Sequence, residues 1–217
     1  MKKKYWILIC SIAGFILALS IFLICFFSIP RVVYGYDSYA DTYYVDYVYG
    51  NASSYIIKDK VHDKPVTKIK ARAFMKKSNL KDVVLGKNID EIERLAFLDC
   101  KKLKNINLDS VKVIGRNAFE NCISLEEIHL SLADILGGAF IGCKSLSKVE
   151  LEDVYSIGSY AFANTSIIKI EIPKSCSLVG EEAFYGCESL KRIIVYSYSL
   201  RNNSYLNSLN GVEFVLN

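Results

Sequence analysis

Residues 115–130 read GRNAFENCISLEEIHL, and residues 136–151 repeat the pattern as LGGAFIGCKSLSKVEL. Both stretches place Ala-Phe, a cysteine, a leucine and then an alternating apolar pair in the same frame. The Ala-Phe pair recurs at intervals of 21–23 residues, at Ala73-Phe74, Ala96-Phe97, Ala118-Phe119, Ala139-Phe140, Ala161-Phe162 and Ala183-Phe184. A regular period of this length indicates a repeat protein in which each copy forms one coil.

Other positions of the repeat are also apolar in every copy. Seven residues before each alanine stand Val66, Ile89, Val111, Leu132, Val154 and Cys176, and four before it stand Ile69, Ile92, Ile114, Ile135, Ile157 and Val179. An alternating pair closes each copy: Val83/Leu85, Ile106/Leu108, Ile128/Leu130, Val149/Leu151, Ile170/Ile172 and Ile193/Val195. Alternation with a period of two predicts a short strand with one buried face. One coil cannot bury its apolar face alone, so the coils must stack, pairing these strands into a parallel sheet and aligning the phenylalanines.

The pattern resembles the BspA-like leucine-rich repeats of bacterial surface proteins. The resemblance rests on IGRNAFENCISLEEIHL from Ile114, IGSYAFANT from Ile157, IEIPKS from Ile170, and the lead-in segments YYVDYVYG and HDKPVTKI around Pro65. It implies a mainly β fold, a leucine-rich-repeat solenoid with a parallel sheet of short strands. It also implies a role in adhesion or in binding at a cell surface.

The segment Tyr5–Ile29 contains no charged residue. As a helix it would extend roughly 37 Å, more than the ~30 Å hydrocarbon core of a bilayer requires. Lys2, Lys3 and Lys4 precede it, so the positive-inside rule keeps the N-terminus in the cytoplasm and sends the repeats outside. The sequence therefore predicts one transmembrane helix before the solenoid, in a single-pass cell-membrane protein with extracellular repeats. A cleaved secretory signal and a buried helix of a soluble protein are the alternatives.

The predicted organisation has five parts: a cytoplasmic tail (1–4), the transmembrane helix (5–29), a linker with a tyrosine-rich cap hairpin (30–62), a six-coil solenoid (63–196) and a C-terminal cap (197–217). Alternation in Tyr43–Tyr49 followed by YGNASS predicts the hairpin, and residues 31–40 read as linker. At the other end, LNGVEFVL (209–216) reads as a strand closing the last coil, after a loop or short helix.

Four cysteines share one column of the repeat, four residues after the alanine: Cys100, Cys122, Cys143 and Cys187. Thr165 fills the same position in the fifth copy, which favours a small buried side chain at a turn. Disulfides are the first alternative, but stacked columns present parallel Cβ vectors that suit a bridge poorly. A metal site is the second, but structural zinc sites use close cysteine pairs.

No motif indicates catalysis, a metal or a cofactor. The two histidines, His62 and His129, lie far apart in the sequence, and there is no G-x-S-x-G, phosphate-binding loop or HExxH. Lys2, Lys3 and Lys4 supply three units of the +4 net charge, leaving +1 for the rest of the chain. We therefore predict a protein that is not an enzyme and has no nucleic-acid partner, since such a partner requires a concentrated basic face.

The residue between the two members of each strand pair, and the residue two positions before it, point onto the open face of the predicted sheet. The first of these columns begins with Val84 and ends with Ile194, with polar residues between them. The candidate partner-binding residues are Asn105, Asn107, Glu127, His129, Lys148, Glu150, Lys169 and Glu171. Solenoids commonly bind proteins through such a face. The competing interpretation is that these charges pair across strands and keep the sheet soluble. The tyrosines of residues 34–49 are a second candidate site. We predict protein–protein binding, including adhesion to a host or neighbouring cell, with a structural envelope role as the alternative.

Overall fold

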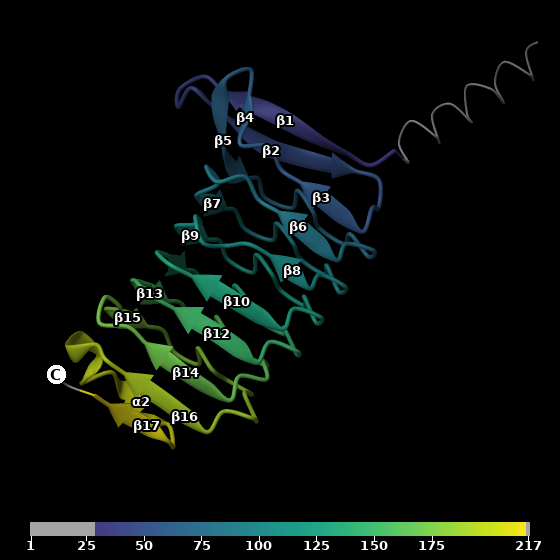
Figure 1. Ribbon diagram of the computed structural model, residues 1–217. Helices are drawn as coiled ribbons and strands as arrows, with labels where there is room; N and C mark the ends of the chain where they lie inside the picture. Colours follow the sequence, from purple (N-terminus) through teal and green to yellow (C-terminus); the bar gives the residue numbers. More distant parts are fainter. Residues whose placement is uncertain (1–28, 216–217) are drawn as a thin grey trace, which may run out of the picture.

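The computed structural model describes residues 29–215 as an elongated stack of coils, with the hairpin β1–β2 at one end and strand β17 at the other (Figure 1). The predicted transmembrane segment 5–29 lies outside the described residues except for Ile29. Within residues 29–215, no helix has the length and apolar character needed to cross a membrane.

Two ladders of strands run along the stack. The first is continuous, in the order β1 (Arg31–Asp37), β2 (Thr42–Tyr49), β5 (Lys64–Ile69), β7 (Glu91–Ile92), β9 (Val113–Ile114), β11 (Asp134–Ile135), β13 (Ser156–Ile157) and β15 (Leu178–Val179), with β4 (Lys60–Val61) beside β5. The second has three parts: β3 (Ser54–Ile56), β6 (Asp82–Val84) and β8 (Asn105–Ile106); β10 (Glu127–Leu130) and β12 (Lys148–Leu151); β14 (Lys169–Ile172), β16 (Arg192–Val195) and β17 (Val212–Phe214). The 3₁₀ helix η1 (Tyr198–Leu200) and helix α2 (Ser204–Ser208) precede β17.

The second ladder is the parallel sheet that the alternating pairs predict. Ile128 faces Val149 and Leu130 faces Leu151, in the register of the repeat. The same holds for Ile170 and Ile193. The prediction of parallel, stacked strands is therefore confirmed, and the strand predicted near the C-terminus is present as β17.

The continuous first ladder was not predicted from the sequence. Its strands β5, β7, β9, β11, β13 and β15 contain the apolar residue four positions before each alanine, and all of these except β5 are only two residues long. Two residues cannot display an alternating pattern, so the column was recognised as apolar but not as a strand. The linker prediction for residues 31–40 is also wrong, because Arg31–Asp37 forms β1 and pairs with β2. The hairpin turn therefore lies at residues 38–41, whereas the predicted turn YGNASS leads from β2 to β3, which pairs with β6.

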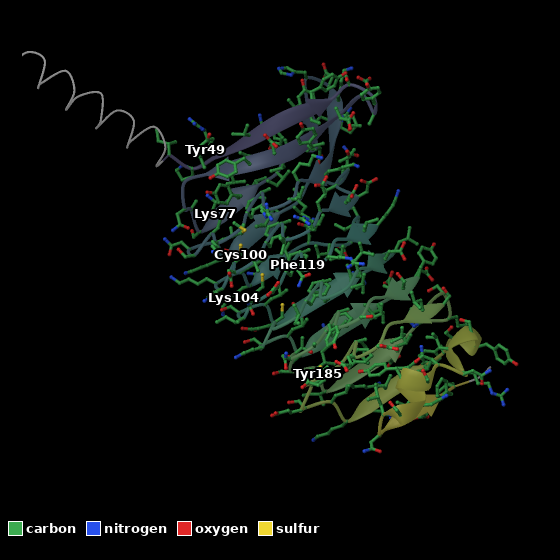
Figure 2. The ribbon with its side chains drawn as sticks, turned by 180° about the vertical axis from the view of Figure 1, so that it is seen from behind. Tyr49, Lys77, Cys100, Lys104, Phe119 and Tyr185 are labelled. Atoms are coloured by element: carbon green, nitrogen blue, oxygen red, sulfur yellow. The ribbon has the colours of Figure 1, made fainter. Side chains whose placement is uncertain are left out.

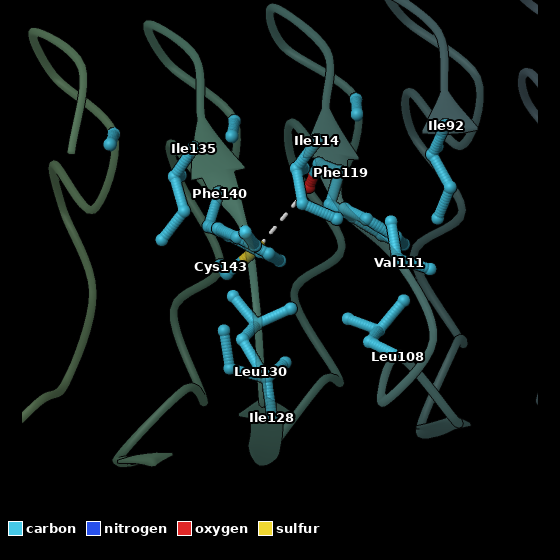
Figure 3. Packing of buried hydrophobic residues seen from close by; sticks show 14 of the residues in the cluster. Ile92, Leu108, Val111, Ile114, Phe119, Ile128, Leu130, Ile135, Phe140 and Cys143 are labelled. Atoms are coloured by element: carbon cyan, nitrogen blue, oxygen red, sulfur yellow. Dashed lines mark hydrogen bonds between the residues drawn. The ribbon is translucent and has the colours of Figure 1, made fainter. Parts of the chain in front are cut away.

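Six phenylalanines form a stacked column through the core. Successive rings from Phe74 to Phe184 lie 4.7–5.9 Å apart between centroids, with interplanar angles of 2–14°. The ring of Tyr55 makes a T-shaped contact with that of Phe74, with centroids 5.6 Å apart and an interplanar angle of 79°, which ends the column at the N-terminal side. Figure 3 shows Phe119 and Phe140 between the isoleucines of one ladder and the leucines of the other.

The cysteine column joins four of the coils to the coil before them. The Sγ of Cys100, Cys122, Cys143 and Cys187 donates to the phenylalanine carbonyl of the preceding coil, at 3.0–3.3 Å. Figure 3 shows the bond from Cys143 to Phe119. All cysteines within residues 29–215 are free thiols, and only Cys187 is not fully buried. The prediction of buried, unbridged cysteines is confirmed for Cys100, Cys122 and Cys143.

At both ends of the solenoid, where no further coil follows, side chains make hydrogen bonds between the terminal coil and the cap. Lys77 occupies the cysteine position of the first coil, and its Nζ donates to the carbonyl of Gly50 in the N-terminal cap at 2.8 Å. At the other end, Asn203 caps helix α2 and its amide donates to the carbonyl of Val179 at 2.9 Å. The terminal coils are thus tied to the caps by hydrogen bonds.

Candidate partner-binding face

The predicted binding residues lie together on the second ladder. We call them the open face, and they are Asn105, Asn107, Glu127, His129, Lys148, Glu150, Lys169 and Glu171. They belong to β8, β10, β12 and β14, with Asn107 directly after β8. Pairing of β10 with β12 sets Glu127 opposite Lys148 and His129 opposite Glu150. Stacking of the coils therefore brings side chains that are about 21 residues apart in the sequence together on one surface.

Charged residues of the open face pair with one another. Lys148 Nζ lies 3.0 Å from Glu150 Oε1 and 3.4 Å from Glu127 Oε2. Lys169 Nζ lies 2.6 Å from Glu171 Oε1 and lowers the pKa of that carboxyl group. These side chains are about half exposed, and exposed pairs contribute little to stability, ~0–1 kcal/mol each. The main effect of these pairs is therefore to place charges of both signs side by side on the surface, and their contribution to the stability of the fold is small.

His129 lies between two carboxylates that are not among the predicted binding residues. Its Nδ1 is 2.6 Å from Asp109 Oδ1 and its Nε2 is 3.1 Å from Glu152 Oε1. The bond to Asp109 raises the pKa of His129, partial desolvation opposes the shift, and the bond to Glu152 adds to it. Asp109 and Glu152 each follow the last apolar residue of a strand pair, a column that sequence reasoning could have examined. This arrangement favours the doubly protonated imidazolium.

Asn107 differs from the other residues of the open face. Its carboxamide accepts from the backbone N–H of Leu85 at 2.7 Å and donates to the carbonyl of Leu85 at 3.1 Å. The side chain thereby takes the place of a backbone partner just beyond the pairing of β6 with β8, which ends at Val83 and Ile106. Asn107 therefore has a structural role in addition to its exposed position.

The outward column that contains Asn107, His129, Glu150 and Glu171 has an apolar residue at each end. One of these residues is exposed and the other is buried. Val84 is 51% exposed and lies opposite Ile56, which is 72% exposed. Ile194 was predicted to point outward, yet it is only 6% exposed. It lies between Glu171 and Glu213 in the register, where both flanking strands are paired with β16. The prediction for Ile194 is therefore wrong.

The open face is shallow and polar. One hollow between β10, β12 and β14 is lined by His129, Lys148, Glu150, Glu152 and Lys169, among others. Within residues 29–215, no group of three or more His, Cys, Asp or Glu side chains is placed to hold a metal ion. The arrangement suits contact with a complementary polar surface better than enclosure of a small molecule.

The tyrosine-rich hairpin offers a separate aromatic surface. Tyr36 and Tyr47 are 44% and 47% exposed, and Tyr39 at the hairpin turn is fully exposed. Other tyrosines hold the cap in place: the Tyr34 hydroxyl accepts from the backbone of Lys58, and the Tyr43 hydroxyl bonds His62 Nδ1 at 2.8 Å. The hairpin thus caps the stack and leaves some aromatic rings available.

Comparison with protein families identifies the repeat. The family model of the BspA type leucine rich repeat region matches residues 67–191 in six copies. The chain belongs to this family. The match covers the coils whose strands build the open face, so the resemblance seen in the sequence is confirmed. A search of the curated proteins gave no match.

Solved structures of bacterial leucine-rich-repeat proteins share the fold. A leucine rich cell surface protein from Faecalibacterium prausnitzii is 26% identical with a TM-score of 0.56, covering 79% of this chain and 55% of its own. The leucine rich repeat protein of T. pallidum is 24% identical with a TM-score of 0.57, covering 75% and 68%. The pneumococcal vaccine antigen PcpA is 23% identical with a TM-score of 0.59, covering 78% and 48%. The chain thus spans only about half the length of two of these proteins.

Proposed function

We propose that this BspA type protein is anchored in the cell membrane by residues 5–29 and binds another protein through the open face. The observation that carries the proposal is the register of the second ladder, which assembles polar side chains from successive coils on one exposed surface. Leucine-rich-repeat proteins generally bind protein partners, and solenoid surfaces suit extended contacts. The similar Faecalibacterium prausnitzii protein is described as a cell surface protein, which supports an extracellular position for the repeats.

The charge pattern of the open face indicates what kind of partner it fits. Lys148 and Lys169 alternate with Glu127, Glu150 and Glu171 along neighbouring strands. A partner with interspersed charges of both signs could exchange these internal pairs for intermolecular ones. Adhesion to a host or neighbouring cell is the form of binding that we propose.

A matched pair of triple variants tests the open face. One variant changes His129, Lys148 and Glu150 to Ala, and the control changes Arg116, Glu120 and Lys144, which lie on the turns, to Ala. Both should melt near the parent temperature, because exposed single substitutions change stability by only about ±0.5 kcal/mol. Central contact residues contribute ~1 kcal/mol or more each, so the open-face variant should lose a partner that the parent and the control both capture.

The measurement is capture of surface proteins by the immobilised repeat domain, identified by mass spectrometry and confirmed with the purified partner. Loss of binding in the turn variant alone would contradict the open-face proposal. Failure to capture any partner would favour the structural envelope role. The anchor is tested separately by adding protease to intact cells, which should remove the repeats and leave residues 1–29 in the membrane.

A further inference from the structure

Lysines gather on one segment of the first two coils. Residues 75–81 and 98–104, which lead from the phenylalanine towards the second ladder, contain six lysines and one acidic residue, Asp99. The equivalent segment of the third coil, residues 120–126, contains two glutamates and no basic residue. The low net charge of the chain therefore hides a local concentration of positive charge beside the N-terminal cap.

We call the exposed members of this group the lysine corner: Lys76, Lys81, Lys101, Lys102 and Lys104. Hydrogen bonds place them side by side across adjacent coils. The backbone N–H of Lys104 donates to the carbonyl of Lys81 at 2.8 Å, and Lys102 Nζ donates to Asn79 Oδ1 at 3.2 Å. The backbone of Lys81 is in turn bonded to Ser53 of the cap. The lysine corner therefore lies directly beside the cap.

Strand β1, which begins at Arg31, starts at the same edge of the solenoid. The Arg31 guanidinium lies 4.4 Å from the ring centroid of Tyr49, and Lys77 bonds the carbonyl of the next residue, Gly50. Figure 2 shows Tyr49, Lys77 and Lys104 along one edge of the stack. Strand β1 therefore starts beside the lysine corner and not at the far end of the solenoid.

An exposed aromatic ring accompanies the lysines. Tyr47 is 47% exposed, its ring meets that of Tyr49 edge-on at 4.9 Å, and Lys77 Nζ lies 5.6 Å from its centroid. Tyrosine rings with an apolar body and a polar tip are typical of the interface between bilayer and water. Lysine and tyrosine side chains on one edge form the combination that headgroup regions attract.

We infer that the lysine corner rests on a bilayer surface that carries anionic headgroups. This inference rests on the proposed membrane anchor, because only Pro30 separates the apolar run 5–29 from strand β1. Coils stack at about 4.8 Å, so the lysines of the second coil lie about two strand spacings from the cap. That distance is comparable to the Debye length of ~8 Å at physiological salt, within which a charged surface attracts lysines. The contact would fix how the solenoid stands relative to the membrane.

The test uses the full chain in bilayer discs of phosphatidylcholine, with or without about 30% phosphatidylglycerol. An amine-reactive acetylating reagent labels exposed lysines, and mass spectrometry gives the rate at each position. Lys101, Lys102 and Lys104 should be acetylated about threefold or more slowly on the anionic discs, and high salt should remove the difference. Lys144, Lys174 and Lys191 on distant coils are internal references whose rates should not change.

A variant pair separates surface charge in general from the lysine corner. In K101E/K102E/K104E, the protection of Lys76 and Lys81 should disappear, and in the matched variant K144E/K174E/K191E it should persist. Both must first show a cooperative thermal transition. If the corner variant does not fold, the position-resolved labelling of the parent chain still decides the question.

The outcomes distinguish the inference from the proposed function. A chain that associates with neither disc contradicts the anchor. A chain that associates with both discs but is labelled equally on them overturns the lysine-corner inference alone. Protection of the same lysines by soluble double-stranded DNA, without protection by anionic discs, would assign the corner to another polyanion and would also overturn it.

Discussion

The hydroxyl oxygen of Tyr205 lies 2.9 Å from the backbone nitrogen of Phe184 and accepts its hydrogen bond. In the five preceding coils, the corresponding phenylalanine N–H donates to the alanine carbonyl of the next coil at 2.7–2.8 Å. Tyr205 belongs to helix α2, so a side chain of the C-terminal cap supplies the acceptor that a seventh coil would have provided. The series of hydrogen bonds from phenylalanine N–H groups to the following coil therefore ends at this hydroxyl group.

Tyr205→Phe should therefore destabilise the last coil. The substitution keeps the ring but leaves the Phe184 N–H without its acceptor, at a cost of ~1–3 kcal/mol for a buried donor. Thermal melting should shift downward, and amides of β16 and β17 should exchange faster. Tyr198→Phe is the matched control, because Tyr198 is 71% exposed. Equal melting temperatures for both variants would contradict a capping role for Tyr205.

The buried thiols should be unreactive in the folded protein. Burial raises the pKa of Cys100 and Cys143 to about 12, so almost no thiolate is present at pH 8. Iodoacetamide should modify the half-buried Cys187 first and the others only after unfolding, as measured by mass spectrometry. Reductant should not lower the melting temperature, because the described cysteines are free. A large loss of stability on reduction would show that a disulfide had been missed.

Substitutions at Cys122 should follow the space available to its side chain. Cys122→Lys should unfold the coil, because an unpaired charge would enter a fully buried position. Cys122→Thr should be milder. In the fifth coil, Thr165 fits the same position, although its hydroxyl donates to Phe162 of its own coil at 2.9 Å and not to the coil before. The melting temperature of Cys122→Thr should therefore lie between those of the parent and of Cys122→Lys. A melting temperature of Cys122→Lys equal to or above that of Cys122→Thr would contradict the prediction.

The raised pKa of His129 makes a small part of the stability depend on pH. Because the folded pKa lies above the ordinary value, the contribution is fully present below about pH 6.5 and is lost as the pH rises through the raised value. The difference in melting temperature between the parent and His129→Gln should therefore be larger at acidic than at alkaline pH. Asp109→Asn should lower the pKa of His129, measured by NMR titration of its ring protons. A parent–variant difference that grew with pH would contradict the assignment.

Stacking and strand register could be predicted because they depend on apolar residues repeated in every copy. The pattern failed where one copy departs from it locally. Leu132 stands in the column of Val111 and Val154 but is only half-buried, and its neighbour Ala133 is fully buried. The interval from Ala118 to Ala139, 21 residues, is the shortest between successive Ala-Phe pairs. With one residue fewer in this copy, the buried position lies six residues before the alanine and not seven.

The open face was predictable in its positions but not in its contacts. Period-two alternation determines which side chains point outward, and stacking determines which columns meet. It does not reveal that Asp109 and Glu152 approach His129, because both residues lie beyond the strand ends. Nor does it reveal the carboxamide of Asn107 bonding to the backbone of the preceding coil.

Asn107 should consequently behave unlike the rest of the open face when it is changed. Leu85 is 3% exposed, and Asn107→Ala removes the partners of both its N–H and its carbonyl. The expected loss is ~1–3 kcal/mol, whereas Asn107→Asp keeps the acceptor for the N–H and should lie between the parent and the alanine variant. Asn105→Ala is the control, because the Asn105 amide bonds only to the exposed carboxylate of Asp82 and should change stability by less than about 0.5 kcal/mol. Urea unfolding of the three variants decides the matter. If Asn107→Ala is as stable as Asn105→Ala, the carboxamide does not support the end of the β6–β8 pairing.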